Sequence, residues 1–364
     1  MKKYLWFVMV VLLSTQIGFA SIKFSGSARV RPRYDLKIYK VGTDDVTYKG
    51  DMYFQYRAKL NINGTLGDKF FFKGQISHNS PANWSIMGDG SDLPSTSAVG
   101  SGQSQSIAFT ELCLGYNGEK FGYKLGRFSF AHNTLLDIHY YPTKLLDIPF
   151  FIFNNNAITG AEVSYKLKKH YIKAALSVDE NNINYQNFID IEGDSVVYDQ
   201  DGITGIIDAG FKFDKLTVSP SVIYSRGKTM SNPITAGTRV QYASSGLLLK
   251  AEAGYSTSNH TGDLYQYNGV IIRGEVRKKI GFGTLRFMYD YSNMSYTTFN
   301  GTDYATGQYG IYHYTWLEYT MPLFKSEFGS IVARPVWRRY ASDIETSGQK
   351  FIRHKIEIFF QYAF

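Results

Sequence analysis

The sequence predicts an all-β protein, a transmembrane antiparallel β-barrel of about 16 strands, and three observations support this prediction. Long segments alternate between apolar and polar side chains, which is the period of a strand with two unlike faces. The links between these segments alternate between short and long. The chain ends on an alternating segment, 351–364, without the polar tail that most soluble chains carry.

The first 20 residues have the layout of a cleaved secretory signal. Lys2 and Lys3 precede an apolar run from Leu5 to Leu13, and Ala20 ends the small-residue cleavage site. This run has nine residues, whereas a membrane-spanning helix needs roughly 20. We therefore predict a signal peptide over 1–20, export of the chain, and a barrel over 21–364.

Neither membrane helices nor disulfides can form the framework of the mature chain. No apolar run approaches the roughly 18 residues of a membrane helix, and a single cysteine, Cys113, excludes an intramolecular disulfide. Tyrosine and phenylalanine are abundant, at 29 and 26 residues. A domain of this length without helices or disulfides must be held together by β-pairing.

The first two strands alternate almost without error. In 23–37 the odd positions are small, polar or charged, among them Arg29, Arg31 and Arg33, and the even positions could face lipid. In 52–63 the polar face carries Arg57 and Lys59. Two such strands in succession indicate a sheet with one water-exposed face and one apolar face.

The remaining strands follow in order, and Asn117-Gly118 is a strong hairpin signal between two of them. The full set of predicted strands is 23–37, 52–63, 69–78, 106–116, 121–130, 158–167, 171–178, 203–213, 216–226, 235–242, 247–256, 267–280, 284–294, 309–321, 330–340 and 351–364. Pro32, Pro220 and Pro335 fall inside strands, where proline removes a ladder donor. We expect bulges at these three positions, or errors of register in the predicted strand boundaries.

The lengths of the links decide between a membrane barrel and a soluble sandwich. Short links are predicted at 64–68, 117–120, 168–170, 214–215, 243–246, 281–283 and 322–329, and longer polar links at 41–50, 79–105, 131–157, 179–202, 227–234, 257–266, 295–308 and 341–349. Short periplasmic turns and long extracellular loops are typical of outer-membrane barrels. A Greek-key sandwich does not sort its loops in this way.

The last strand also predicts how the barrel closes. Ile356, Ile358, Phe360, Tyr362 and Phe364 should face lipid and the periplasmic interface, whereas Arg353, Lys355 and Glu357 should face the pore. Because the strand number is even, this strand should pair with 23–37. The pore should then be most positive where Arg353 and Lys355 approach the arginines of the first strand.

The mature chain resembles a bacterial outer-membrane porin of the sixteen-stranded type. The resemblance rests on the signal peptide, the first strand FSGSARVRPRY starting at Phe24, the alternation of loop lengths, and the ending IFFQYAF at Phe364. It implies an outer-membrane location in contact with lipid and lipopolysaccharide, a homotrimer, and recognition of the C-terminal strand by the barrel-insertion machinery.

The resemblance also implies a role for the segment 131–157, because the corresponding loop of such porins folds inward and narrows the pore. This segment is unusually apolar for an external loop, and large exposed apolar patches are uncommon outside interfaces. A subunit contact and a crossing strand segment remain alternatives. It lacks the Pro-Glu-Phe-Gly-Gly run often found in general porins. The candidate constriction residues are Asp137, His139, Tyr141, Lys144 and Asp147.

The alternation places more basic than acidic side chains inside the barrel. The inward basic candidates are Arg29, Arg31, Arg33, Lys37, Arg57, Lys59, Lys73, Lys124, Lys166, Lys173, Lys212, Lys250, Arg273, Arg277, Lys279, Arg286, Arg353 and Lys355. The acidic candidates are Asp35, Glu111, Glu162, Asp208, Glu252, Glu275, Asp290 and Glu357. Rings of Lys and Arg side chains around a pore favour anions, so we predict a modest anion preference. The alternative is that these groups are cross-strand neighbours that neutralise one another.

Three functions remain from the sequence alone. The first is a porin for passive diffusion of small hydrophilic solutes, without a cofactor. The second is a substrate-specific channel for an anionic solute or oligosaccharide, using Arg29, Arg31, Arg33, Arg57 and Lys59, since guanidinium forks suit phosphate and carboxylate. The third is an adhesin or an exported soluble β-protein.

Catalysis, metal binding and nucleic-acid binding are not indicated. The seven histidines are scattered, and none lies at a convincing metal-ligand spacing. No Ser-His or paired-Asp arrangement suggests an enzyme. Basic residues alternate with apolar ones rather than forming a continuous patch, which argues against a nucleic-acid partner.

Overall fold

The computed structural model describes residues 20–41, 45–78, 85–87, 107–130, 157–179, 188–189, 195–196, 202–226, 234–258, 265–298, 308–344 and 349–364. All regular secondary structure in these ranges is β-strand. No helix in the described part of the chain is long and apolar enough to cross a membrane.

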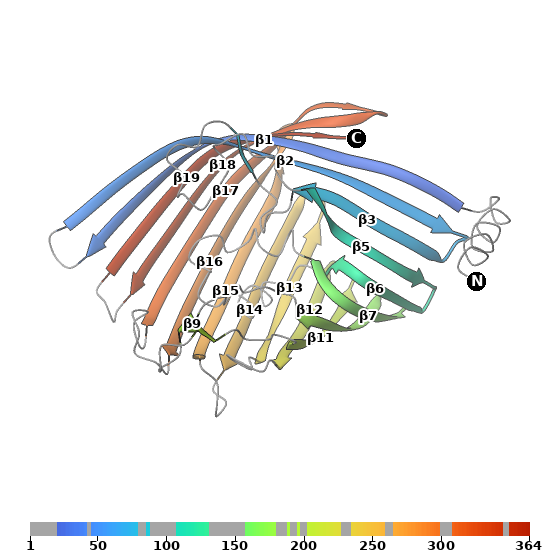
Figure 1. The fold of residues 1–364 in the computed structure, drawn as a ribbon. Helices are drawn as coiled ribbons and strands as arrows, with labels where there is room; N and C mark the ends of the chain where they lie inside the picture. The colour runs from blue at the N-terminus through green and yellow to red at the C-terminus, as the bar shows by residue number, and fades with distance from the viewer. Residues whose placement is uncertain are drawn as a thin grey trace.

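Sixteen antiparallel strands form a closed ring. Figure 1 shows this barrel from the side. The strands of the ring are β1 (Ala20–Val41), β2 (Asp45–Leu66), β3 (Phe70–His78), β5 (Ile107–Asn117), β6 (Phe121–Ser129), β7 (Ala157–Leu167), β8 (His170–Asp179), β11 (Gly202–Phe213), β12 (Leu216–Arg226), β13 (Ile234–Ser244), β14 (Leu247–Ser258), β15 (Tyr265–Ile280), β16 (Gly283–Thr298), β17 (Gln308–Ser326), β18 (Gly329–Ile344) and β19 (Gln349–Ala363). Three short strands were not predicted: β4 (Ser85–Met87) pairs with β2, and β9 (Phe188–Ile189) pairs with β10 (Ser195–Val196).

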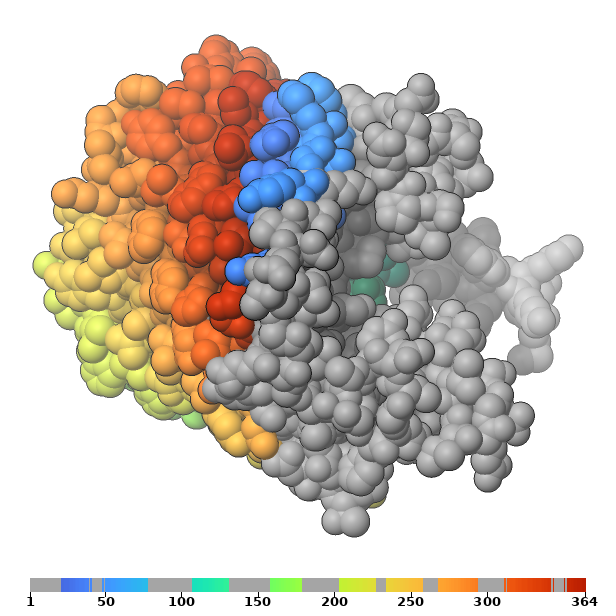
Figure 2. Space-filling view, turned by 90° about the vertical axis from the view of Figure 1, so that its left-hand side faces the viewer, coloured from blue at the N-terminus to red at the C-terminus, as the bar shows by residue number. Residues whose placement is uncertain are grey.

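The ring closes through the two ends of the chain, as predicted. β1 pairs antiparallel with β19, with Arg33 opposite Glu357 and Asp35 opposite Lys355. In Figure 2 the red C-terminal strands adjoin the blue N-terminal strands on the surface. Residues more than 300 positions apart in sequence therefore share one wall.

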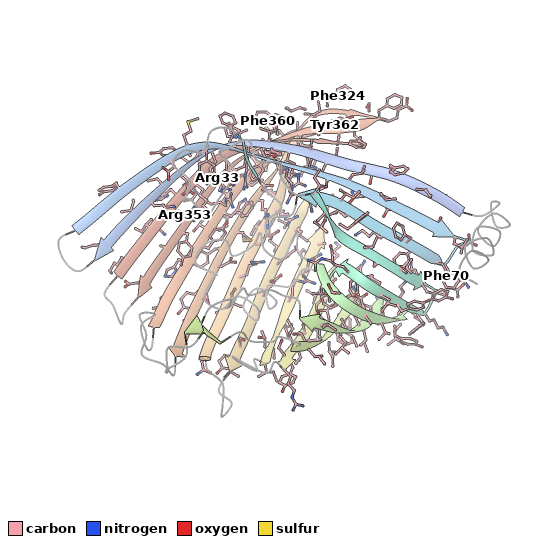
Figure 3. The ribbon with its side chains drawn as sticks, in the orientation of Figure 1. Arg33, Phe70, Phe324, Arg353, Phe360 and Tyr362 are labelled. Carbon is pink, nitrogen blue, oxygen red and sulfur yellow. The ribbon has the colours of Figure 1, made fainter. Side chains whose placement is uncertain are left out.

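The outer face is apolar and the inner face is charged, which identifies a transmembrane barrel. Ile356, Ile358 and Phe360 on β19 are 54%, 42% and 46% exposed, whereas the alternating Lys355 and Glu357 are only 6% and 2% exposed. In Figure 3 Phe360 and Tyr362 lie on the convex side of the sheet, and Arg33 and Arg353 lie on its concave side. The predicted orientation of the last strand is confirmed.

The predicted alternation of link lengths is largely confirmed. One end of the barrel carries tight turns at 67–69, 118–120, 168–169, 214–215, 245–246, 281–282 and 327–328. Several predicted boundaries were wrong, because strands run further than their apolar alternation. The first link on the loop side is only 42–44, and β17 continues to Ser326 instead of ending near Met321.

The bulges predicted at the three prolines do not occur. Pro32 lies opposite Phe54, Pro220 opposite Thr238, and Pro335 opposite Ile358, all in unshifted register. On the other side of each proline the ladder is interrupted, but the register resumes unchanged. A missing donor is thus accommodated by losing pairing on one side rather than by inserting a residue.

Two bulges occur in the described strands, one of them beside Pro322. Thr110 is the extra residue where β5 passes β3, and Leu323 is the extra residue where β17 passes β18. The Thr110 hydroxyl donates to the backbone carbonyl of Gln75, 3.3 Å away. A bulge leaves one residue unpaired and re-aims its neighbours, so the inward position of Glu111 depends on it.

The wall is uneven in height. β3, β5, β6, β7 and β8 have 9 to 11 residues, whereas β1 and β2 have 22 and β17 has 19. Figure 1 shows the short green strands following the much longer blue ones around the barrel. The tall side contains the seam where the chain ends meet, and most of the arginines lie there.

Candidate functional site: the charged lumen wall

The densest charge lies on the inner face of β1, β2, β17, β18 and β19. We call this group the seam cluster. Its basic members are Arg29, Arg31, Arg33, Arg57, Arg334, Arg338, Arg353 and Lys355, and its acidic members are Asp35, Glu318 and Glu357. Strand alternation places all of them on the same face. Eight basic groups against three acidic ones leave the cluster strongly positive.

Glu357 is the central carboxylate of the seam cluster. Its Oε2 accepts from Arg33 Nε and Nη2, both at 2.8 Å, and lies 3.2 Å from Arg31 Nη1. Arg338 contacts its other oxygen. Arg31, Arg33 and Arg338 come from β1 and β18, the two neighbours of β19. One carboxylate therefore ties three strands together with charge-assisted contacts.

Asp35 has the same role one step nearer the loops. Arg353 donates to it through Nε at 2.7 Å and Nη2 at 2.5 Å, a bidentate pair across the β1–β19 seam. The Tyr53 hydroxyl donates to Asp35 Oδ2 at 3.2 Å and accepts from Arg33 Nη1 at 3.1 Å. Tyr53 thus connects the two carboxylate centres into one network.

The turn-side part of the seam cluster has fewer carboxylates. Arg29 lies directly opposite Arg57 on β2 and opposite Gln361 on β19, and Arg334 Nη2 donates to Gln361 Oε1 at 3.3 Å. The buried Nε atoms of Arg29 and Arg334 have no hydrogen-bond partner among the described residues. These guanidinium groups therefore retain donors that could bind an anion.

Aromatic rings hold several of the guanidinium groups. Arg286 and Arg338 both stack on Trp316, at 5.0 and 4.9 Å from the ring centroid. Arg31 lies 5.0 Å from the Phe359 ring and Arg33 5.6 Å from the Tyr53 ring. Such cation–π contacts fix a flexible side chain, so the positive charge occupies defined positions on the wall.

The neighbouring wall, β13 to β16, carries a more balanced relay of ion pairs. Arg273 donates to Asp290 at 2.8 Å and lies 3.8 Å from Glu252, which also faces Arg239 at 3.9 Å. Nearer the turns, Arg286 pairs with Glu275 at 2.9 Å, and Arg277 contacts the same carboxylate. Cross-strand neutralisation, the alternative left open by the sequence, is the arrangement seen here.

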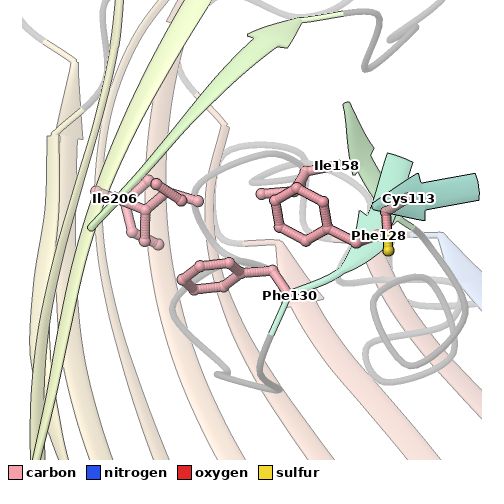
Figure 4. Close-up of a cluster of buried hydrophobic side chains, with 7 residues drawn as sticks. Cys113, Phe128, Phe130, Ile158 and Ile206 are labelled. Atoms are coloured by element: carbon pink, nitrogen blue, oxygen red, sulfur yellow. The ribbon is translucent and has the colours of Figure 1, made fainter. Parts of the chain in front are cut away.

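The short wall, made of β3 and β5 to β8, pairs each of its two inward carboxylates with a lysine and is partly apolar. Lys73 pairs with Glu111 at 2.5 Å and Lys124 with Glu162 at 2.9 Å. Between and beyond these pairs, a buried apolar cluster faces inward, shown in part in Figure 4: Cys113, Phe128, Phe130, Ile158, Ala175, Ile206 and Ile223. The inward arginines are therefore gathered at the seam and on β13 to β16, whereas the short wall carries an apolar patch and the further inward lysines Lys166 and Lys173.

The sequence-predicted residues separate into these groups. Arg29, Arg31, Arg33, Arg57, Arg353 and Lys355 meet in the seam cluster; Lys59 lies beside it and donates to Gln75 at 3.0 Å. Arg273, Arg277 and Arg286 belong to the β13–β16 relay, and Lys73 to the short wall. The structure brings these basic residues together at the seam, where Asp35 and Glu357 offset part of their charge.

Sequence reasoning missed five inward residues that the structure makes central. They are Arg334, Arg338, Arg239, Glu318 and Trp316. Alternation could have found two of them, because Arg334, Val336, Arg338 and Tyr340 form a clean inward series on β18. The candidate constriction residues Asp137, His139, Tyr141, Lys144 and Asp147 lie outside the described residues. Among the described residues no group of His, Cys, Asp and Glu could hold a metal ion.

Comparison with solved structures identifies the fold. The outer-membrane channel DcaP of Acinetobacter baumannii matches with a TM-score of 0.60 at 14% identity, over 95% of this chain and 98% of that one. OmpF of Salmonella typhi, in complex with daunomycin, matches with 0.55 at 12%, over 93% and 97%. The anion-selective porin of Comamonas acidovorans matches with 0.51 at 12%, over 95% and 100%.

The chain has the fold of an outer-membrane porin. No family model matches the sequence, and no curated protein matches it significantly. The expected sixteen-stranded porin barrel is thus confirmed at the level of fold, over nearly the whole length of the matched chains.

Proposed function

We propose that the protein is an outer-membrane porin that passes small hydrophilic solutes passively, with a modest preference for anions. The observation that carries the proposal is the closed barrel with an apolar exterior and a charged interior. The seam cluster supports the anion preference, because its basic groups outnumber its carboxylates and raise the local concentration of anions. No cofactor is required for this function.

Reversal potentials across planar bilayers test the anion preference. In a salt gradient, the purified protein should give an anion-to-cation permeability ratio above one, and the double variant R29Q/R334Q should move this ratio toward one. K325Q is the matched control, because Lys325 is exposed at the β17–β18 turn. Cation selectivity of the unaltered protein contradicts the proposed preference, and no conductance at all contradicts the porin and favours adhesion.

A substrate-specific channel for an anionic solute or oligosaccharide is the second candidate, favoured by the arginines held against aromatic rings. A pre-positioned guanidinium loses little entropy when it binds phosphate or carboxylate. R31A and R57A should then relieve block by phosphate or a dicarboxylate. Liposome swelling with graded sugars gives the complementary test: a size cutoff alone indicates general diffusion, and one favoured solute indicates specificity.

We further propose that the segment 131–157 rests on the inner wall and narrows the pore. The support is the inward apolar cluster, which includes Phe130 and Ile158 immediately beside the two ends of this apolar segment. The variant D137N/D147N should then shift the reversal potential toward anions, whereas D343N on the outer face should not. Equal selectivity of both variants would instead favour a subunit contact.

The signal peptide, the subunit number and the cellular location are also proposals. A signal peptide over 1–20 is tested by N-terminal sequencing of the mature protein, which should begin at Ser21. A homotrimer is supported by the fold and by the trimer form of the similar Vibrio cholerae OmpT structure, 12% identical with a TM-score of 0.52 over 95% of this chain and 100% of that one. Native mass spectrometry in detergent measures the subunit number directly.

Fractionation should place the protein in the outer membrane, with lipid and lipopolysaccharide as neighbours.

A further inference from the structure

The turn end of the barrel carries a dense group of lysines on three consecutive hairpins. These hairpins are β5–β6, β7–β8 and β11–β12, which are neighbours because β6 pairs with β7 and β8 pairs with β11. The turn-end lysine patch is the name we give to Lys120, Lys166, Lys168, Lys169, Lys212 and Lys215. Five of these lysines are exposed and Lys166 is half-buried.

The turn-end lysine patch is not neutralised by the part of the chain that the structure describes. Two carboxylates, Glu119 and Asp214, lie in the same three turns. Neither of them, and none of the six lysines, forms an ion pair with a described residue. The Lys166 ammonium donates to the neutral Asn117 Oδ1 at 2.7 Å. Six lysines and two carboxylates leave the patch with four positive charges in excess.

Backbone hydrogen bonds join the three turns into one continuous rim. The Lys166 N–H donates to the carbonyl of Lys120 at 2.7 Å, which ties the β7–β8 hairpin to the β5–β6 turn. The Lys212 N–H donates to His170 Nδ1 at 3.0 Å, which ties β11 to the β7–β8 hairpin. The lysines therefore project from a rim whose backbone is held in place.

The backbone of Lys168 indicates that its side chain has a role. Five tight turns contain a residue in the left-handed region, and four of these residues are Gly67, Asp214, Gly246 and Gly281. The fifth is Lys168, with a φ of +56°. Glycine, Asn and Asp adopt this conformation readily, whereas it is unfavourable for a side chain such as lysine. Strained backbone of this kind is concentrated at functional sites.

The turn-end lysine patch extends from the turn tips into the mouth of the pore. Lys166 continues the inward series of Glu162 on β7, and Lys212 continues that of Asp208 on β11. Glu162 and Asp208 are only 3% and 2% exposed. A lipid headgroup outside the barrel can reach the turn tips but not these two inward lysines. A polypeptide that crosses the rim can contact both groups.

We propose that the turn-end lysine patch binds an acidic, extended segment of a periplasmic protein, and that the bound segment lies across the pore mouth and reduces conductance. Adjacent hairpins are two strands apart, so their lysines recur about every 10 Å around the rim. An extended chain rises about 3.3 Å per residue, so carboxylates about three residues apart meet successive hairpins. The loss of conductance, but not the binding, rests on the proposed porin function.

The use of lysine at all six positions fits an unfolded acidic partner. A lysine ammonium is a flexible, strongly hydrated point charge, whereas the planar guanidinium of arginine suits bidentate recognition of one fixed carboxylate or phosphate. The seam cluster, by contrast, contains seven arginines and one lysine. The patch can therefore accept carboxylates at varied angles along a chain.

A second copy of the chain is a poorer occupant of the patch. Subunits in one membrane present the same end to the periplasm. The described carboxylates of the tight turns are Asp68, Glu119, Asp214 and Glu327, and each lies within two residues of a lysine. This end of the barrel therefore offers no acidic surface to a neighbouring subunit.

Binding is measured by the fluorescence anisotropy of a labelled polyglutamate peptide of about twelve residues, long enough to span the three hairpins. The peptide is titrated with the purified, folded protein in neutral detergent. The variant K168Q/K169Q should bind about fivefold more weakly than the unaltered protein, because two exposed charge contacts are lost. The matched control K278Q/K279Q removes the same charge from the turn end of β15, outside the patch, and should bind within about twofold of the unaltered protein.

Planar bilayers test the effect on conductance. Polyglutamate should reduce the current when it is added to one chamber only, K168Q/K169Q should lose this one-sided block, and K278Q/K279Q should retain it. Block from both chambers, or a block that survives in K168Q/K169Q, contradicts the proposed site. Absence of current from the unaltered protein refutes the porin function and the block together, whereas conduction without peptide binding refutes this inference alone.

Two further results would overturn the proposal. Equal weakening by K168Q/K169Q and K278Q/K279Q would show a general effect of charge, and displacement of the peptide by anionic phospholipid vesicles would assign the patch to the membrane surface. Lys168→Gly keeps the test decisive if K168Q/K169Q does not fold. Glycine relieves the left-handed backbone at this position, so this variant should unfold at the same or a higher urea concentration and still bind the peptide more weakly.

Discussion

Glu357→Gln isolates the contribution of the carboxylate at the centre of the seam. Glu357 is 2% exposed, and its carboxylate contacts Arg31, Arg33 and Arg338. Gln has the same shape but no charge, so three buried guanidinium groups lose their common counter-charge. Removing one partner of a buried ion pair costs about 3–5 kcal/mol. We expect a loss of this size, because the strands on either side of β19 depend on the same group.

The assay is urea unfolding of the refolded protein in detergent micelles, read by the loss of the compact band on unboiled gels and by tryptophan fluorescence. Asp343→Asn is the control. It removes the 2.7 Å pair with Lys350, in which the Asp343 and Lys350 side chains are 44% and 58% exposed. Exposed pairs contribute about 0–1 kcal/mol, so this variant should unfold close to the unaltered protein.

Selectivity gives an independent second measurement. Removing one negative charge from the seam cluster should raise the anion-to-cation permeability ratio of Glu357→Gln, even if the variant is less stable. Unfolding of Glu357→Gln at the same urea concentration as Asp343→Asn would refute the argument that this carboxylate organises the seam. A fall in the permeability ratio would refute the assigned direction of its charge.

Three further outcomes follow from other parts of the barrel. Gly126→Ala should destabilise the protein by about 2 kcal/mol or more. The φ angle of Gly126 is +117°, and a Cβ there would lie 2.4 Å from the carbonyl oxygen of Leu112 on β5. Gly274→Ala is the control in the same urea assay and should leave stability unchanged, because a Cβ at this position would meet no atom within 4 Å. Deleting Phe364 should lower the yield of folded barrel on unboiled gels, because its backbone N and O bond to Gly26 at 3.1 and 2.9 Å; an unchanged yield contradicts this. Trp316→Leu should reduce anion preference in bilayers without changing the charge count, because the two arginines stacked on the ring lose their fixed positions; an unchanged ratio would show that their positions do not matter.

Strand alternation was sufficient to predict most of the fold. The period of two depends only on which residues are apolar, and in a barrel every strand has one face toward lipid, so the signal repeats in each strand. This is why the faces of β19 and its pairing with β1 were predicted correctly. The effects of the prolines and the positions of the bulges were not predicted correctly, because the neighbouring strand determines whether a hydrogen-bond ladder is interrupted or shifted.

The distribution of charge in the lumen could be predicted only in part. Alternation correctly placed Arg31, Arg33, Arg353 and Glu357 on the inner face. It could not say which charges pair, because a pair requires register between strands that are hundreds of residues apart, as for Arg33 and Glu357. The difference between the positive seam and the balanced β13–β16 relay is a property of register.

The sequence by itself determined that this chain forms an antiparallel transmembrane barrel with short turns at one end and its two terminal strands paired. Those features follow from local periodicity and link length. Tertiary structure decided that Glu357 serves three arginines and that Trp316 fixes two guanidinium groups. Each depends on the closure of the ring, which brings residues into contact at distances of a few ångströms that no local pattern encodes.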